Sequence, residues 1–170
     1  MTITVSASSL VKTSFNFTET QSSTIRSENE SLTSNRAYTY GSGNFEIDAA
    51  VKTTGVLPSG GSVIFDVTSM SNTSFGITST VAFSGVKTIT VQNTSTIQGR
   101  DINIRATGAN AFTNIFNGGS GNLLIKPYSS FTYSDPYRLS TSSTQKNISL
   151  FDVSGSGATY EICVLGNFQR

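Results

Sequence analysis

Residues 146–166, KNISLFDVSGSGATYEICVLG, decide the fold class of this chain. Two apolar-patterned runs flank a Ser-Gly-Ser-Gly segment at 154–157, which predicts an antiparallel hairpin. In the second run Tyr160, Ile162 and Val164 fall on one face, and Glu161, Cys163 and Leu165 fall on the other. Because a lone hairpin is at best marginally stable in water, this one needs a partner sheet.

The first of the two runs changes phase in its middle. Ile148 and Leu150 share one face, whereas Phe151 and Val153 fall on the opposite face. Two structures fit this pattern: a bulge near residues 150–151, or a strand that is buried on both sides.

The rest of the chain is also patterned for strands. Good helix formers are scarce, β-branched residues are plentiful, and turn residues recur at short intervals. Gly41-Ser42-Gly43 predicts a second hairpin or one bent strand around it, and we expect the strand at 87–93 to pair with 101–107. The further predicted strands cover residues 10–18, 62–70, 122–126 and, along a sheet edge between two prolines, 127–136.

The number and spacing of these runs predict one all-β domain over residues 1–170. Eight to ten short strands favour an antiparallel β-sandwich with jelly-roll-like connectivity. An immunoglobulin-like topology is the alternative, weakened because the chain has no Trp and only one Cys. Residues 19–36 are the most polar segment and are expected to form a surface loop or a mobile arm.

The composition excludes several classes of function. The net charge is +1, charged residues make up 12 % of the chain, and the sequence shows no basic patch of the kind that follows a phosphate backbone, so nucleic-acid binding is disfavoured. Ser and Thr, 28 and 24 residues, take the place of charge. The N-terminus lacks a signal-peptide pattern and no apolar run is long enough to span a membrane, so we expect a soluble protein made in a cytoplasm.

Candidate residues for catalysis or metal binding are few. The absence of His excludes Ser-His-Asp and Cys-His arrangements and the usual zinc sites. Cys163 is interpreted as a small buried hydrophobe. A hydrolase would have to use Glu46 with Asp48 or another acid, but a solvated strand surface is favoured for both, and Asp66 and Asp152 are expected at outward or edge positions. The sequence therefore predicts no catalytic residues, no cofactor and no metal.

The tyrosines are the candidates for an interaction surface. Tyr38 and Tyr40 share a strand face, and Tyr128, Tyr133 and Tyr137 cluster around two prolines. Exposed aromatic residues beside Asn and Ser are typical of sugar-binding faces and of protein interfaces. The alternative is packing at the ends of the sandwich.

Several stretches resemble small β-sandwich structural proteins of virions, mainly those of tailed bacteriophages. They are TYGSGNFEIDAAVKTTGVLPSGGSVIFDVTSM (39–70), RATGANAF with Gly108, NGGSGNLLIKPYSSFTYSDPYRLS (117–140) and KNISLFDVSGSGATYEICVLG. The resemblance covers roughly residues 35–166. Proteins of this kind serve as capsid decoration or cement proteins and as fibre or tail modules, and they act by assembly without catalytic residues.

The resemblance implies a viral structural protein that is not an enzyme. It would form a homo-oligomer, a trimer being expected, and bind the major capsid protein or another virion protein, so that its location is the virion assembled in the host cytoplasm. The alternative is a carbohydrate- or receptor-binding module of a phage fibre or tail, marked by exposed Tyr128, Tyr133 or Tyr137 around a polar groove. No nucleic acid and no membrane are expected as partners.

Overall fold

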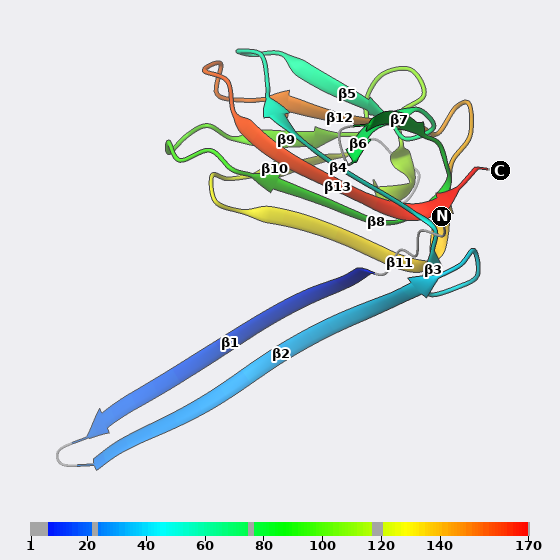
Figure 1. Cartoon of the computed structure of the whole chain (residues 1–170). Helices are drawn as coiled ribbons and strands as arrows, with labels where there is room; N and C mark the ends of the chain where they lie inside the picture. The colour runs from blue at the N-terminus through cyan, green and yellow to red at the C-terminus, as the bar shows by residue number, and fades with distance from the viewer. Residues whose placement is uncertain (1–6, 22–23, 75–76, 117–120, 170) are drawn as a thin grey trace.

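The computed structural model describes residues 7–21, 24–74, 77–116 and 121–169, and almost all of their regular structure is β-strand (Figure 1). In chain order, the elements are β1 (Ala7–Gln21), β2 (Thr24–Tyr40), β3 (Glu46–Ile47), β4 (Ala49–Val56), β5 (Ser62–Asp66), β6 (Met70–Ser74), β7 (Ile77–Val81), β8 (Phe83–Asn93), β9 (Ile102–Arg105), the 3₁₀ helix η1 (Thr113–Phe116), β10 (Asn122–Ile125), β11 (Ser130–Ser140), β12 (Asn147–Asp152) and β13 (Thr159–Phe168).

Two four-stranded sheets form the body of the molecule, in the orders β11-β8-β13-β4 and β10-β9-β12-β5. Among these eight strands the first pairs with the last (β4 with β13) and the second with the seventh (β5 with β12). The third pairs with the sixth (β8 with β11) and the fourth with the fifth (β9 with β10), all antiparallel. This nesting is a jelly roll, so the predicted antiparallel β-sandwich is confirmed.

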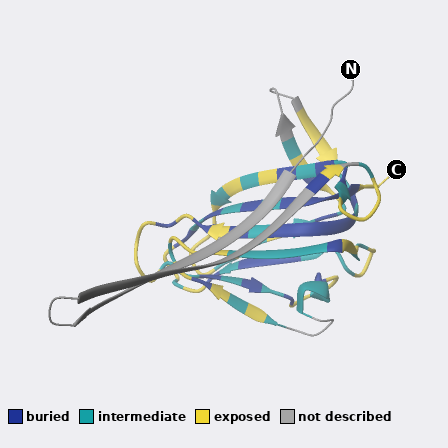
Figure 2. Ribbon diagram, turned by 90° about the horizontal axis from the view of Figure 1, so that it is seen from below, coloured by how far each residue is buried: buried dark blue, intermediate teal, exposed yellow. Residues whose placement is uncertain are grey.

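The core lies between the two sheets. Alternate residues of the central strands are almost completely buried, as the dark strands in Figure 2 show. They include Ile89 and Val91 of β8, Ile102 and Ile104 of β9, Ile148 and Leu150 of β12, and Ile162 and Val164 of β13. Burial of one such aliphatic side chain stabilises the fold by about 1.5–3 kcal/mol, so these residues fix the register of both sheets.

The predicted hairpin over residues 146–166 is wrong, although both of its strands exist. β12 and β13 belong to opposite sheets, and the segment between them crosses from one sheet to the other. Asp152, at the start of this crossing segment, is 1 % exposed. The prediction that it lies at an outward or edge position is therefore wrong. Gly155 and Gly157 have φ values of +69° and +75°, a backbone conformation that glycine adopts without strain.

Two other predicted pairings need the same correction. β8 and β9 lie in opposite sheets, so residues 87–93 do not pair with 101–107. The segment around residues 41–43 is neither an antiparallel hairpin nor one bent strand, because β2 and β3 are separate strands that pair in parallel through Thr39–Glu46 and Tyr40–Ile47. In each case the apolar alternation identified the strand, but many sheet partners satisfy the same alternation.

Two further predictions concern β12 and β11. The pairing of β12 with β5 and β9 runs without a shift, so no bulge occurs at residues 150–151. β12 is instead a central strand, and Phe151 on its outer face lies under the guanidinium group of Arg105 at 3.6 Å from the ring centre. β11 is an edge strand, as the two prolines predicted.

A long hairpin leaves the body at one end of the sandwich (Figure 1). β1 and β2 pair in register from Ala7–Tyr38 to Gln21–Thr24. Residues 19–36, expected as a loop or arm, therefore belong largely to regular strands. We call the backbone of residues 7–21 and 24–37 the arm, and residues 38–47 the arm base.

Candidate functional site

Tyr38 lies at the arm base and is 2 % exposed. Its hydroxyl lies 2.7 Å from Ser134 Oγ and accepts a hydrogen bond of 3.1 Å from Thr88 Oγ1, on the outer face of the β11-β8-β13-β4 sheet. The ring belongs to a small cluster with Ile47 and Leu165. This corrects the placement of Tyr38 on an exposed interaction surface, because its role is to fasten the arm to the body.

A buried lysine completes the attachment of the arm base. Lys87 is 1 % exposed, and its ammonium group donates to the carbonyl of Gly43 and, at 2.6 Å, to that of Glu46. Asn167 Nδ2 donates to the carbonyls of Gly41 and Glu46 at 3.1 and 3.3 Å. Burial lowers the pKa of Lys87, while the nearby Glu46 carboxylate raises it. Lys87 is the fifth residue of β8, and the sequence analysis did not identify it, because nothing along the chain indicates that its ammonium group meets the carbonyls of residues 43 and 46.

The carboxylates considered for hydrolysis serve the backbone around them. Glu46 accepts a 2.7 Å hydrogen bond from the N–H of Gly43 within its own turn. Asp48 lies beyond the end of β3 and accepts a 2.5 Å hydrogen bond from the N–H of Phe168. Asp66 pairs with Lys146 at 2.6 Å. Each acid is thus used in holding a turn or a strand end.

Asp152 organises the opposite end of the sandwich, where the β4–β5, β8–β9, β10–β11 and β12–β13 connections meet; we call this the loop end. Its carboxylate accepts hydrogen bonds from the N–H groups of Gly60 and Gly157 at 2.9 Å, and from the N–H and hydroxyl of Ser154 at 3.1 and 2.6 Å. Burial alone would raise the pKa of Asp152, but these hydrogen bonds outweigh it and lower the pKa to about 2. One buried anion therefore joins two of the four connections.

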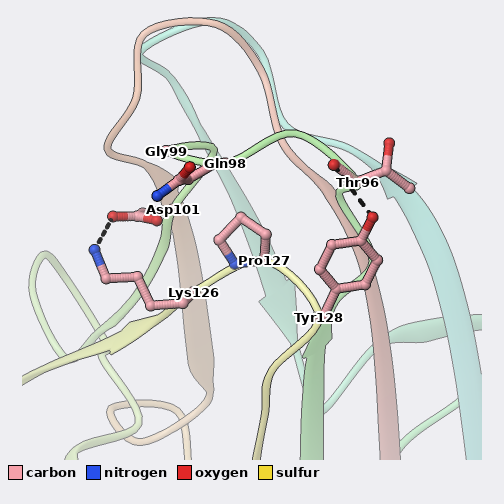
Figure 3. A pocket seen from close by; sticks show the side chains of 7 residues that line it. All are labelled: Thr96, Gln98, Gly99, Asp101, Lys126, Pro127 and Tyr128. Atoms are coloured by element: carbon pink, nitrogen blue, oxygen red, sulfur yellow. Dashed lines mark hydrogen bonds and ion pairs between the residues drawn. The ribbon is translucent and has the colours of Figure 1, made fainter.

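A groove of about 460 Å³ opens between the other two connections at the loop end (Figure 3). Asp101 and Lys126 form an ion pair of 2.7 Å on one side of it. On the other side the Tyr128 ring is 71 % exposed, and its hydroxyl donates to the carbonyl of Thr96 at 3.2 Å. The lining residues are Thr96, Gln98, Gly99, Asp101, Lys126, Pro127 and Tyr128.

The remaining predicted tyrosines do not join Tyr128 in one patch. Tyr137 is 68 % exposed and lies within an irregularity in β11, where the pairing with β8 shifts between residues 134 and 139. Tyr133 is half-buried and paired with Ile89 in register. The side chain of Tyr40 lies outside the described residues. Tyr128 alone borders the groove, so the predicted cluster is divided between a loop and the edge strand β11.

The groove holds polar residues that the sequence did not single out. Gln98 and Asp101 come from the β8–β9 connection, and Lys126, 25 or more residues further along the chain, comes from the β10–β11 connection. They come together only where these connections meet at the loop end, and their spacing in the sequence does not predict this arrangement.

Three further observations concern metal ligands, the cysteine and membrane-spanning helices. The part of the chain that the structure describes contains no group of three or more His, Cys, Asp or Glu residues placed to hold a metal ion. Burial raises the pKa of the Cys163 thiol; the residue packs against the Tyr38 cluster but is half-buried rather than buried as predicted. None of the described helices is long and apolar enough to cross a membrane.

The fold and the sites define a jelly-roll β-sandwich with a projecting hairpin. No protein-family model matches the chain, and no curated protein matches it. Among solved structures it is similar to the crystal structure of the Yersinia pseudotuberculosis-derived mitogen (YPM). That likeness has 13 % identity and a TM-score of 0.36 over 73 % of this chain and 91 % of the mitogen chain. The fold assignment therefore rests on the strand order alone.

Proposed function

We propose that this chain is a non-enzymatic structural protein of a virion, of the capsid decoration or cement kind. It forms a homotrimer and binds the major capsid protein or another virion protein. The observation that carries the proposal is the arm, which extends from a well-packed jelly roll (Figure 1). The resemblance of the body to small virion proteins supplies the setting.

The arm has a physical need for a neighbour. Its strands of 15 and 17 residues span about 50 Å at the usual rise per residue. Within the described residues β1 pairs with β2 alone, so the other edge of β1 presents backbone N–H and C=O groups without strand partners. A two-stranded hairpin is at best marginally stable in water. An arm of this length therefore gains its stability by lying on another subunit, as arms that order on assembly do.

The body offers a surface that could receive such an arm. The outer face of the β10-β9-β12-β5 sheet carries Ile64 and Leu124, which are 60 % and 47 % exposed. Phe151 lies between them under Arg105. The Ile64 and Leu124 side chains remain largely exposed, whereas the arm base covers part of the outer face of the other sheet. We assign the open face to subunit contact.

The experiment compares the mass of the full chain in solution with that of arm variants. Asn16 and Asn29 are opposite each other in the middle of the arm, so the double variant Asn16→Pro/Asn29→Pro removes two backbone donors there. The matched control is Asn16→Ala/Asn29→Ala. We expect light scattering to give three times 18.0 kDa for the wild type and the alanine control, and one chain for the proline variant.

The proline variant should keep the circular dichroism and the unfolding transition of the body, because the hydrogen bonds described between this hairpin and the body come from the arm base. A wild-type chain that stays monomeric at all concentrations and does not cosediment with capsids or tails would overturn the proposal. A proline variant that remains trimeric would show that the arm is not needed for assembly.

One observation favours a second candidate function, a carbohydrate- or receptor-binding module of a fibre or tail. The groove at the loop end combines an exposed aromatic ring with polar side chains (Figure 3). In that case the arm would anchor the module and the loop end would face outward.

A further inference from the structure

We propose that the groove at the loop end is a binding site for a neutral saccharide. One sugar ring stacks on Tyr128, and its hydroxyl groups bond to Gln98, Asp101 and Lys126. The inference rests on the second candidate function and is independent of the arm, because saccharide binding and particle assembly are measured separately.

The exposure of Tyr128 is built into the backbone. Its φ is +63°, a conformation that non-glycine residues adopt at a cost of about 1 kcal/mol or more. The turn keeps this conformation through hydrogen bonds from Tyr128 N–H to the Asn93 carbonyl and from Ser129 N–H to the Lys126 carbonyl, both 3.0 Å. As a result the ring lies beside the groove, with its hydroxyl held by Thr96 (Figure 3).

The two walls of the groove are fixed to each other before any ligand arrives. Asn93 is completely buried, and its Nδ2 donates to the carbonyls of Arg100 and Ile125 at 2.7 and 3.0 Å. Its Oδ1 accepts a 3.0 Å hydrogen bond from the N–H of Ser95. Val153 N–H donates to the Asp101 carbonyl at 3.1 Å, which joins the groove to the segment organised by Asp152. A preformed site of this kind loses little conformational entropy on binding.

The polar groups suit hydroxyl groups better than ions. The Asp101 carboxylate and the Lys126 ammonium group neutralise each other, so the groove has no excess charge to attract a phosphate or a sulfate. Asp101 Oδ1 is buried and, within the described residues, has no hydrogen-bond partner. Toward the open groove, the Gln98 amide offers a donor and an acceptor, and the Lys126 ammonium group, whose side chain is 63 % exposed, offers donors.

A pyranose ring matches this arrangement on both of its surfaces. Its C–H face is apolar and fits the exposed ring of Tyr128 and the adjacent Pro127, which lie side by side in Figure 3. Each of its hydroxyl groups can donate and accept a hydrogen bond, which matches the donors and acceptors that line the groove. A volume of about 460 Å³ accommodates one or two sugar rings.

The experiment screens the full chain on an array of neutral and acidic glycans, and measures the hits by NMR titration with the corresponding methyl glycosides. We expect neutral glycans to bind, with amide shifts confined to residues 96–101 and 126–129. Tyr128→Ala should weaken binding about tenfold or more, whereas Tyr128→Phe should stay within about threefold of the wild type. The matched control is Tyr137→Ala, an equally exposed tyrosine on β11, which should bind as the wild type does.

Gln98→Ala provides a second variant, expected to weaken binding, should Tyr128→Ala lose the amide spectrum of the folded chain. The proposal is overturned by an array without neutral hits, by hits that bind Tyr128→Ala undiminished, or by binding restricted to acidic glycans. A protein partner that requires Tyr128 while no glycan binds overturns it as well. None of these results changes the mass in solution, so the proposal of arm-mediated assembly is judged apart from them.

Discussion

The two ends of the sandwich each hold loops through a buried charge, but they use opposite charges. At the loop end the Asp152 carboxylate collects N–H donors, and at the arm base the Lys87 ammonium group collects carbonyl acceptors. The pKa of Asp152 falls below its usual value, so folding favours its charged form. The pKa of Lys87 also falls, which for an amine means that folding disfavours its charged form. The loop end is therefore stabilised by its charge, whereas the arm base retains its charge at a cost.

The largest effect is expected from Asp152→Ala. The substitution leaves the N–H groups of Gly60 and Gly157 without their acceptor, and each buried donor without a partner costs about 1–3 kcal/mol. We expect the free energy of unfolding, measured by urea denaturation, to fall by about 3 kcal/mol. Asp135→Ala is the control, because Asp135 accepts one exposed N–H bond from Tyr137 and should change stability by less than about 1 kcal/mol. Equal losses in both variants would contradict the role of Asp152.

Acid should destabilise the loop end through the same carboxylate. The pKa of Asp152 is lowered from 3.8 to about 2, so its stabilisation is present above pH 3.8 and is lost as the pH falls through about 2. The difference in unfolding free energy between the wild type and Asp152→Asn should shrink by about 2 kcal/mol between neutral pH and the acid side of this range. A pH-independent difference would show that Asp152 is not ionised in the folded chain.

Lys87→Met should have a smaller effect than Asp152→Ala. The variant loses hydrogen bonds to Gly43 and Glu46 but removes the cost of burying an ammonium group, and we expect a net loss of about 1–2 kcal/mol at neutral pH. Because the folded pKa is lowered, the unfolded chain binds the proton more tightly. The wild type should therefore gain stability relative to Lys87→Met as the pH rises through the folded pKa of Lys87 toward 10.5. A fall in the stability of the wild type relative to Lys87→Met over that pH range would show that folding raises the pKa of Lys87.

The smallest effect separates two tyrosines whose hydroxyls are both hydrogen-bonded. Tyr38→Phe removes buried hydrogen bonds to Ser134 and Thr88 and should cost about 1 kcal/mol of unfolding free energy. Tyr128→Phe removes one exposed bond to Thr96 and should leave stability within about 0.5 kcal/mol of the wild type. Equal losses of unfolding free energy in the two variants, measured by thermal or urea unfolding, would show that the buried and the exposed hydroxyl contribute equally to stability.

Tyr38 and Tyr128 also show which part of the candidate site the sequence does not predict. Tyr38 and Tyr128 were predicted together as interaction residues, because both stand among Ser, Thr and Asn. The structure buries the first against an outer sheet face and exposes the second on a turn with φ of +63°. The two tyrosines have similar neighbours along the chain and different neighbours in space, so the sequence does not distinguish the buried residue from the exposed one. The groove residues Gln98, Asp101 and Lys126 are not identified from the sequence, since the first two meet Lys126 only when the β8–β9 and β10–β11 connections converge.

What the sequence by itself determined is the strand content and the inward faces. The alternation of Ile89 with Val91, of Ile102 with Ile104 and of Ile162 with Val164 specifies half-buried strands, since side chains of a strand alternate between its faces. What only the tertiary structure decided is the pairing, because alternation is a property of one strand and does not name its partner. The nesting of β4 with β13 around the inner pairs separated the expected hairpin into two sheets, buried Asp152 at the crossing and formed the groove beside it. These features depend on contacts between residues far apart in the chain, whose cost in loop entropy is met only when the whole sandwich closes.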